Sequence, residues 1–147
     1  GAYLGRPAQV RRKLKKKKHF FSMNTTRDDK GCYLVAMDGI DVPFDFSMLV
    51  IDQFARQKGW TDMSLSDIFT KVIDKPTYGD AIAFFKVALT SAWQKHQRKD
   101  STPTDGMLAE YYFKIYYAAQ ESMVAFFKNN GIDLTQLNQE AGEAKKA

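Results

Sequence analysis

The sequence predicts an α+β fold in which an N-terminal β-hairpin packs on a bundle of four or five α-helices. Two segments with the two-residue period of a strand lie on either side of Asp38-Gly39, the strongest short signal for a tight hairpin turn. From Ser47 onwards, successive segments begin at a serine or threonine and repeat apolar residues at helical spacing. With 147 residues, of which 44% are apolar, the chain is long enough for one packed domain.

The hairpin is expected around this turn. A type I′ turn needs positive φ at both central residues, which Asp38 and Gly39 tolerate. One face of the return strand holds Ile40, Val42, Phe44 and Phe46. The opposite face holds Asp41, Pro43 and Asp45. Pro43 has no N–H group to donate to a neighbouring strand. We therefore expect an edge strand, to which a partner can add a strand through Asp41, Pro43 and Asp45.

The first two helices are predicted from their ends. Ser47 can cap a helix at residues 48–58, and Gly59 follows it as a C-terminal stop. The apolar stripe of this helix consists of Val50, Ile51, Phe54 and Ala55. Ser64 and Asp67 form the S-x-x-D start of a short helix that ends before the next proline.

Two long helices follow. Thr77 and Asp80 repeat this start for a helix at about residues 78–98. Its buried face is expected to hold Ala81, Phe85, Ala88, Leu89 and Ala92, with Trp93 at the margin. Thr104 can cap the next helix, which we expect to run to about Asn130 and to stop at Gly131.

The positive charge is confined to the N-terminal segment. Residues 1–30 hold ten basic and two acidic residues, a net charge of +8, whereas residues 31–147 hold twelve basic and fifteen acidic residues, a net charge of −3. We therefore expect a basic, disordered arm at residues 1–30 and a single domain at residues 31–147. The domain should end in a weak helix capped by Asp133 and a frayed tail.

Three interpretations of the arm stay open. Lysine codons are purine-rich, as is a ribosome-binding site, so the lysine run before Met23 fits a translated, non-native leader. A second interpretation is a solvated extension without function. The third is a functional arm in which residues 6–18 weakly neutralise the phosphates of a nucleic acid. The body of the chain lacks the interleaved basic and aromatic residues that are usual in nucleic-acid modules.

Several classes of function are disfavoured. No apolar run approaches the roughly 18 residues of a membrane helix, and no signal peptide is evident. The single Cys32 rules out an internal disulfide and favours a reducing cytoplasm. Cys32, His19 and His96 are too few and too scattered for a zinc site, so we interpret Cys32 as an inert thiol and His96 as an edge-of-core residue. No catalytic motif is present, and we expect no enzyme activity, metal or cofactor.

The segment from Leu108 to Asn130 is apolar around most of a helical wheel. One face holds Leu108, Tyr112, Ile115, Ala119, Met123 and Phe126. Phe113, Tyr117 and Val124 lie on nearly the opposite side. Such a helix is either central in the fold or used twice, once for the core and once for a partner, and both alternatives stay open. In the second case Phe113, Tyr117 and Val124 form a partner-binding surface.

The order of these elements resembles the tail assembly chaperones of long-tailed bacteriophages and prophages. A strand pair with the return strand GIDVPFDF is followed by the helix FSMLVIDQFARQKGW. The alanine- and aromatic-rich helix DAIAFFKVALTSAW and a helix that ends in AFFKNN come next. The resemblance covers about residues 31–130, and the basic arm is a departure from the family's pattern.

The resemblance implies a non-enzymatic protein of the bacterial host cytoplasm. Such a protein binds the long, helical tape measure protein, keeps it soluble and helps recruit tail tube subunits. The resemblance also implies that a longer product can arise by ribosomal frameshifting, and Lys145-Lys146 near the end of the chain is compatible with this. Self-association is expected separately, through the edge strand at residues 41–46. An alternative of a different class is a nucleic-acid-binding accessory protein that acts through the basic arm, and a third is a small interaction domain.

Overall fold

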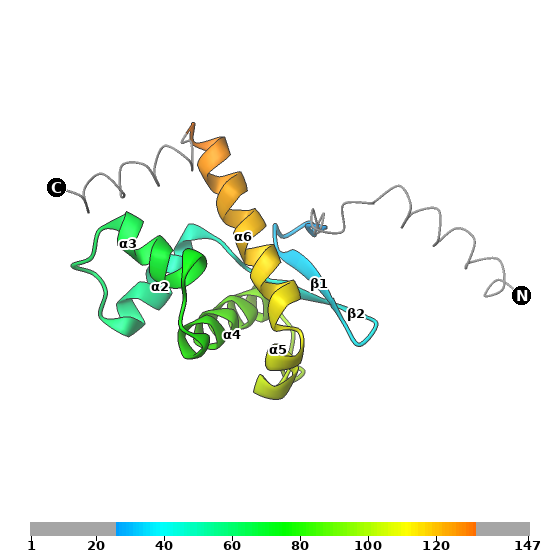
Figure 1. Ribbon diagram of the computed structural model, residues 1–147. Helices are drawn as coiled ribbons and strands as arrows, with labels where there is room; N and C mark the ends of the chain where they lie inside the picture. Colours follow the sequence, from blue (N-terminus) through cyan, green and yellow to red (C-terminus); the bar gives the residue numbers. More distant parts are fainter. Residues whose placement is uncertain (1–25, 132–147) are drawn as a thin grey trace, which may run out of the picture.

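The computed structural model describes residues 26–131, which form a hairpin followed by a bundle of helices (Figure 1). The elements in chain order are β1 (Tyr33–Met37), β2 (Ile40–Phe44), α2 (Met48–Lys58), α3 (Leu65–Phe69), η1 (Thr70–Asp74), α4 (Tyr78–Lys95), α5 (Asp105–Glu110) and α6 (Tyr112–Asn129). The predicted α+β fold is confirmed. The basic arm, the leader before Met23, the nucleic-acid contacts of residues 6–18, the helix at Asp133 and the frayed tail concern positions outside the described residues.

The folded part begins earlier than the expected boundary at residue 31. The N–H group of Leu34 donates to the carbonyl of Thr26 at 2.8 Å, and Arg27 forms an isolated β-bridge with Tyr33. The Arg27 guanidinium also lies over the Tyr33 ring, 5.1 Å from its centre. The last residues of the predicted arm are therefore part of the domain, held there by backbone pairing that charge composition alone did not reveal.

The hairpin has the predicted turn. Its strands are antiparallel, and the register pairs Tyr33 with Phe44 and Met37 with Ile40. Asp38 has a φ of 53° and Gly39 a φ of 77°, the positive values that a type I′ turn requires. The turn therefore fixes the register that sends Val35 and Phe44 into the core.

The helix starts also follow the sequence. At α2, α3, α4 and α5 the capping side chain accepts a hydrogen bond from the N–H group three residues later: Ser47, Ser64, Thr77 and Thr104. Gly59 closes α2 in the left-handed conformation, with a φ of 74°. Two ends differ from expectation. α4 stops at Lys95, and the long final helix is interrupted at Tyr111, so that α5 and α6 are separate.

The core lies where the hairpin meets α2, α4 and α6. α4 packs against β2 and α2, while α6 packs against β1 and η1 and runs across the molecule, beginning beside α5 (Figure 1). Phe84 of α4 links the elements, since its ring lies 5.7 Å from that of Phe46 and 5.5 Å from that of Phe54. Ring contacts at these separations stabilise a core beyond the burial of apolar area.

Candidate partner-binding surface

α6 has two apolar faces, and only one of them is buried. The buried face consists of Ile115, Ala118, Ala119, Ser122, Met123 and Phe127. On the other side Phe113 is 70% exposed, Tyr117 41% and Val124 49%. The three residues predicted as a stripe therefore lie at the surface of the folded chain. Within residues 26–131, one face of this helix therefore packs in the core and the other is exposed, and partner binding by the exposed face stays a prediction.

The exposed rings of α6 belong to a continuous aromatic surface, made of Tyr78, Tyr112, Phe113, Tyr116 and Tyr117. Tyr78, at the start of α4, stacks on Tyr112 with ring centres 5.5 Å apart. The Tyr112 ring lies 5.4 Å from that of Phe113 and 6.0 Å from that of Tyr116. Tyr116 in turn lies 6.3 Å from Tyr117. Sequence reasoning missed Tyr78, Tyr112 and Tyr116. The available signal for the two tyrosines of α6 was the recurrence of adjacent aromatic residues one helical turn apart, at Tyr112-Phe113 and Tyr116-Tyr117.

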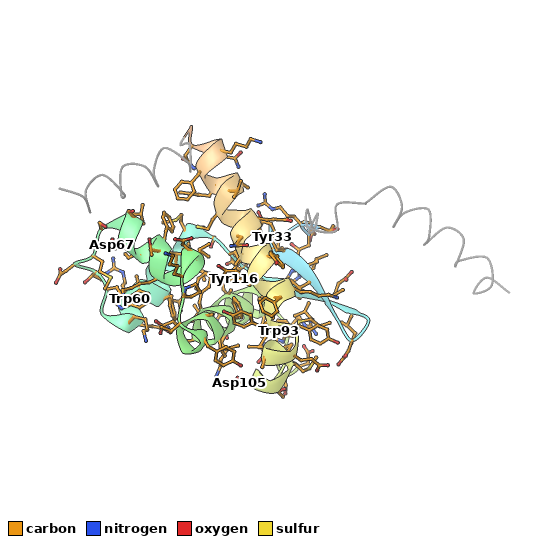
Figure 2. All side chains as sticks on the ribbon, in the orientation of Figure 1. Tyr33, Trp60, Asp67, Trp93, Asp105 and Tyr116 are labelled. Atoms are coloured by element: carbon orange, nitrogen blue, oxygen red, sulfur yellow. The ribbon has the colours of Figure 1, made fainter. Side chains whose placement is uncertain are left out.

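Tyr116 holds the aromatic surface in place. Its side chain projects from α6 (Figure 2). The hydroxyl donates to the carbonyl oxygen of Ile73 at 2.5 Å and lies 3.3 Å from that of Asp74. Both acceptors are at the end of η1, so the hydroxyl connects α6 to η1. Burial, followed by the neighbouring Tyr112, raises the pKa of Tyr116 above its usual value. The phenol is therefore a neutral donor at physiological pH.

The structure does not place the second predicted surface at an open edge. Asp41 is exposed, but Pro43 is buried and Asp45 is only 2% exposed. The Asp45 N–H group donates to the carbonyl of Ala88 at 3.0 Å, because α4 lies along this end of the hairpin. The burial of Pro43 and Asp45 argues against the expected contact of a partner strand with these two residues, and α4 is the element that meets Asp45. Asp41 alone of the three remains accessible.

A small cleft lies beside Asp45. Its volume is about 230 Å³, and its walls come from the start of the folded part, the start of α2 and the end of α6. Arg27, Lys30 and Lys95 give it a basic lining, with Asp45 as the acidic member. Pockets for small molecules are usually larger, at about 300–1,000 Å³. The cleft therefore does not argue for a small-molecule substrate.

The fold also brings together three side chains that sequence reasoning treated separately. Asp28, Cys32 and His96 each offer one ligand atom, and these atoms all lie within 4.8 Å of one another. Asp28 and His96 are 68 positions apart in the sequence, and their Oδ2 and Nε2 atoms are separated by 2.7 Å. The expectation that Cys32 and His96 are scattered is thus wrong, because their side chains lie close together in the folded chain. No local motif joins them, so the sequence held no signal for this cluster.

The Cys32 thiol is fully buried. Burial raises its pKa to about 11, with further contributions from the charges of Asp28 and Asp45 that outweigh the opposing effect of Lys95. At physiological pH the free thiol is protonated and is a poor nucleophile. This agrees with the interpretation of Cys32 as inert towards covalent chemistry.

Comparison with models of protein families, with curated proteins and with solved structures found no match. Between residues 26 and 131, no helix combines the length and the apolar character needed to cross a bilayer. The function is therefore inferred from the surfaces above and from the order of the elements.

Proposed function

We propose that this protein is a non-enzymatic tail assembly chaperone that binds the long, helical tape measure protein of a bacteriophage or prophage. It would act in the cytoplasm of the bacterial host and help recruit tail tube subunits. The observation that carries the proposal is the exposed apolar stripe of α6, formed by Phe113, Tyr117 and Val124. The order of the elements, which resembles that of the chaperone family, supports the same conclusion.

The stripe suits a helical partner. Phe113, Tyr117 and Val124 follow one face of α6 over twelve residues, which is a length of about 16 Å. A partner helix that lies along this face would bury its own apolar stripe over about three turns. Tyrosine and phenylalanine rings give large contact areas with little conformational entropy to lose, and tyrosine is enriched among residues that dominate binding energy.

The anchored position of the rings supports this role further. Tyr116 is tied to η1 by its hydroxyl, and Tyr112 is stacked between Tyr78 and Tyr116. A surface already held in one arrangement loses less entropy when a partner binds. An exposed apolar surface of this kind would also shield the apolar face of a long helix from self-association, which is what a chaperone must do before the tail tube forms.

The charge of the folded part favours a protein partner over a nucleic acid. Residues 26–131 hold twelve basic and fourteen acidic residues. A surface with this balance does not attract phosphates on average. Nucleic-acid binding through residues 6–18 remains the alternative function, and it concerns positions outside the described residues.

Co-expression tests the proposal directly. The tape measure protein from the same genome, recognisable as a very long helical reading frame, is produced with and without the full chain. We expect it to be insoluble alone, and to be soluble and co-purify when the chain is present. A tape measure protein that stays insoluble, or is soluble without co-purifying, would contradict the proposed function. A chain that purifies with nucleic acid instead would favour the alternative.

A further inference from the structure

The cluster of Asp28, Cys32 and His96 has the composition of a transition-metal site. A carboxylate, a thiol and an imidazole present ligand atoms that all lie within 4.8 Å of one another. Zinc is commonly bound by these three ligand types, with three protein ligands and a water completing a tetrahedron in open sites. We propose that Asp28, Cys32 and His96 bind one Zn²⁺ ion, with water as the fourth ligand.

A tight turn presents two of the ligands together. The N–H group of Asp28 donates to the carbonyl of Cys32 at 2.9 Å, and that of Gly31 donates to the carbonyl of Asp28 at 3.1 Å. Gly31 adopts a φ of 82°, which other residues rarely adopt and which closes the turn. Asp28 and Cys32 are thereby held facing the same side, as two ligands from one short loop must be.

The Asp28 carboxylate is already oriented. Its Oδ1 atom accepts hydrogen bonds from the N–H groups of Lys30 and Cys32, both at 2.9 Å. Its Oδ2 atom is left to face His96. Hydrogen bonds of this kind to a ligating carboxylate are the usual support of a metal site, because they fix the direction of the ligand atom.

The third ligand comes from the end of α4. His96 is the residue that ends this helix, and its N–H group donates to the carbonyl of Ala92 at 3.0 Å. The carbonyl end of a helix carries partial negative charge and favours a cation. The Asp28 carboxylate, whose Oδ2 atom faces the His96 ring, adds a formal negative charge at the same place.

Metal binding requires only local adjustment. In a tetrahedral zinc site the bond lengths of about 2.0–2.3 Å place ligand atoms roughly 3.3–3.8 Å apart. The Asp28–His96 contact of 2.7 Å must open by less than about 1 Å, and any separation near the 4.8 Å limit must shorten by a similar amount. Binding displaces the thiol proton of Cys32, as zinc does in other thiolate sites. Asp28 and His96 are partly exposed, which leaves room for the water.

Cobalt titration of the full chain tests this site. Co²⁺ replaces Zn²⁺ in tetrahedral sites and reports thiolate ligation by a sulfur-to-metal charge-transfer band. We expect a band that saturates at one equivalent of Co²⁺ and disappears when Zn²⁺ is added. The absence of a band with excess Co²⁺, or a band that Zn²⁺ does not remove, would overturn the proposal without any variant.

Variants then assign the ligands. The charge-transfer band should be lost in Cys32→Ser. The visible absorption bands of the bound Co²⁺ should weaken in His96→Gln. His19→Gln, which changes the other histidine of the chain, is the matched control and should titrate as the wild type does. Circular dichroism establishes that each variant is folded. Binding that survives in Cys32→Ser, or that is lost in His19→Gln, would place the metal elsewhere and contradict the site.

Discussion

The carboxylate of Asp45, which is almost fully buried, lies 3.1 Å from the ammonium group of Lys95. The Ser91 hydroxyl donates to the same carboxylate at 2.5 Å. Ser91 and Lys95 are one helical turn apart on α4, so this helix supplies both partners of a charge at the end of the hairpin. The contact explains how an aspartate predicted at an exposed edge is accommodated in the interior.

Removing Lys95 should cost more than neutralising Asp45. Lys95→Met leaves the buried Asp45 carboxylate with Ser91 as a neutral donor. We expect the unfolding free energy to fall by about 2 kcal/mol. This is less than for a fully buried pair, because Lys95 is partly exposed. Asp45→Asn keeps an acceptor for Ser91 and should cost about 1 kcal/mol. Urea denaturation measures both.

The double variant and a control complete this test. Asp45→Asn with Lys95→Met should cost less than the sum of the single changes, since the two groups interact. Lys99→Met removes a charge for which residues 26–131 show no ion pair, and it should be nearly neutral. Strict additivity of the two changes would show that the pair contributes nothing.

Tyr116 should make stability depend on alkaline pH. Tyr116→Phe removes the hydrogen bond to Ile73, at a cost of about 1 kcal/mol at pH 7. The pKa of Tyr116 is raised in the folded state by burial, so the unfolded chain loses its proton first. The stabilising effect of the phenol is thus complete below pH of about 10 and is lost as the pH rises through the folded-state pKa.

The difference between the wild type and Tyr116→Phe should therefore shrink above pH of about 10, as measured by denaturation at a series of pH values. Tyr117→Phe is the control on the same helix, because its ring is 41% exposed and faces outward. A difference for Tyr116→Phe that stays constant from pH 7 to the alkaline limit would refute the role assigned to this hydroxyl.

Deletion of residues 1–22 separates the two classes of function. We expect the shortened chain to keep its unfolding free energy within about 0.5 kcal/mol, the usual scale for changes away from packed features. Any DNA binding by the full chain should be weak, fall steeply with salt and vanish in the shortened chain. Tight DNA binding by a chain that begins at Met23 would favour the nucleic-acid alternative, and a large fall in melting temperature would show that the deleted segment is docked.

Local signals in the sequence predicted local structure well. Ser47 and Thr77 each cap a helix, and Asp38-Gly39 forms the turn, because these features depend on residues within a few positions of one another. The end of α4 and the break at Tyr111 were missed. At Tyr111 the hydroxyl donates to the Asp38 carboxylate across 73 positions, a contact that no local pattern reveals.

The same distinction between local signals and long-range contacts applies to the candidate surfaces. The exposed position of Phe113 and Tyr117 follows from helical periodicity alone, and the structure places both at the surface. The burial of Asp45 depends on α4, and the meeting of Asp28 with His96 depends on a contact between distant segments. Both required the packing of elements that are remote in sequence, which periodicity does not determine.

The most direct measurement is the affinity of the tape measure protein for a double variant of the stripe, Phe113→Ser with Tyr117→Ser. Leu49→Ser, at an exposed apolar position of α2, is the matched control. The double variant should lose little stability, because both rings are exposed and serine costs about 0.5 kcal/mol per helical site. An aromatic residue central to an interface is worth about 2 kcal/mol or more, so we predict a dissociation constant raised by at least about thirtyfold, with no change for Leu49→Ser. A folded double variant that binds as tightly as the wild type would contradict the assignment of this stripe as the contact surface.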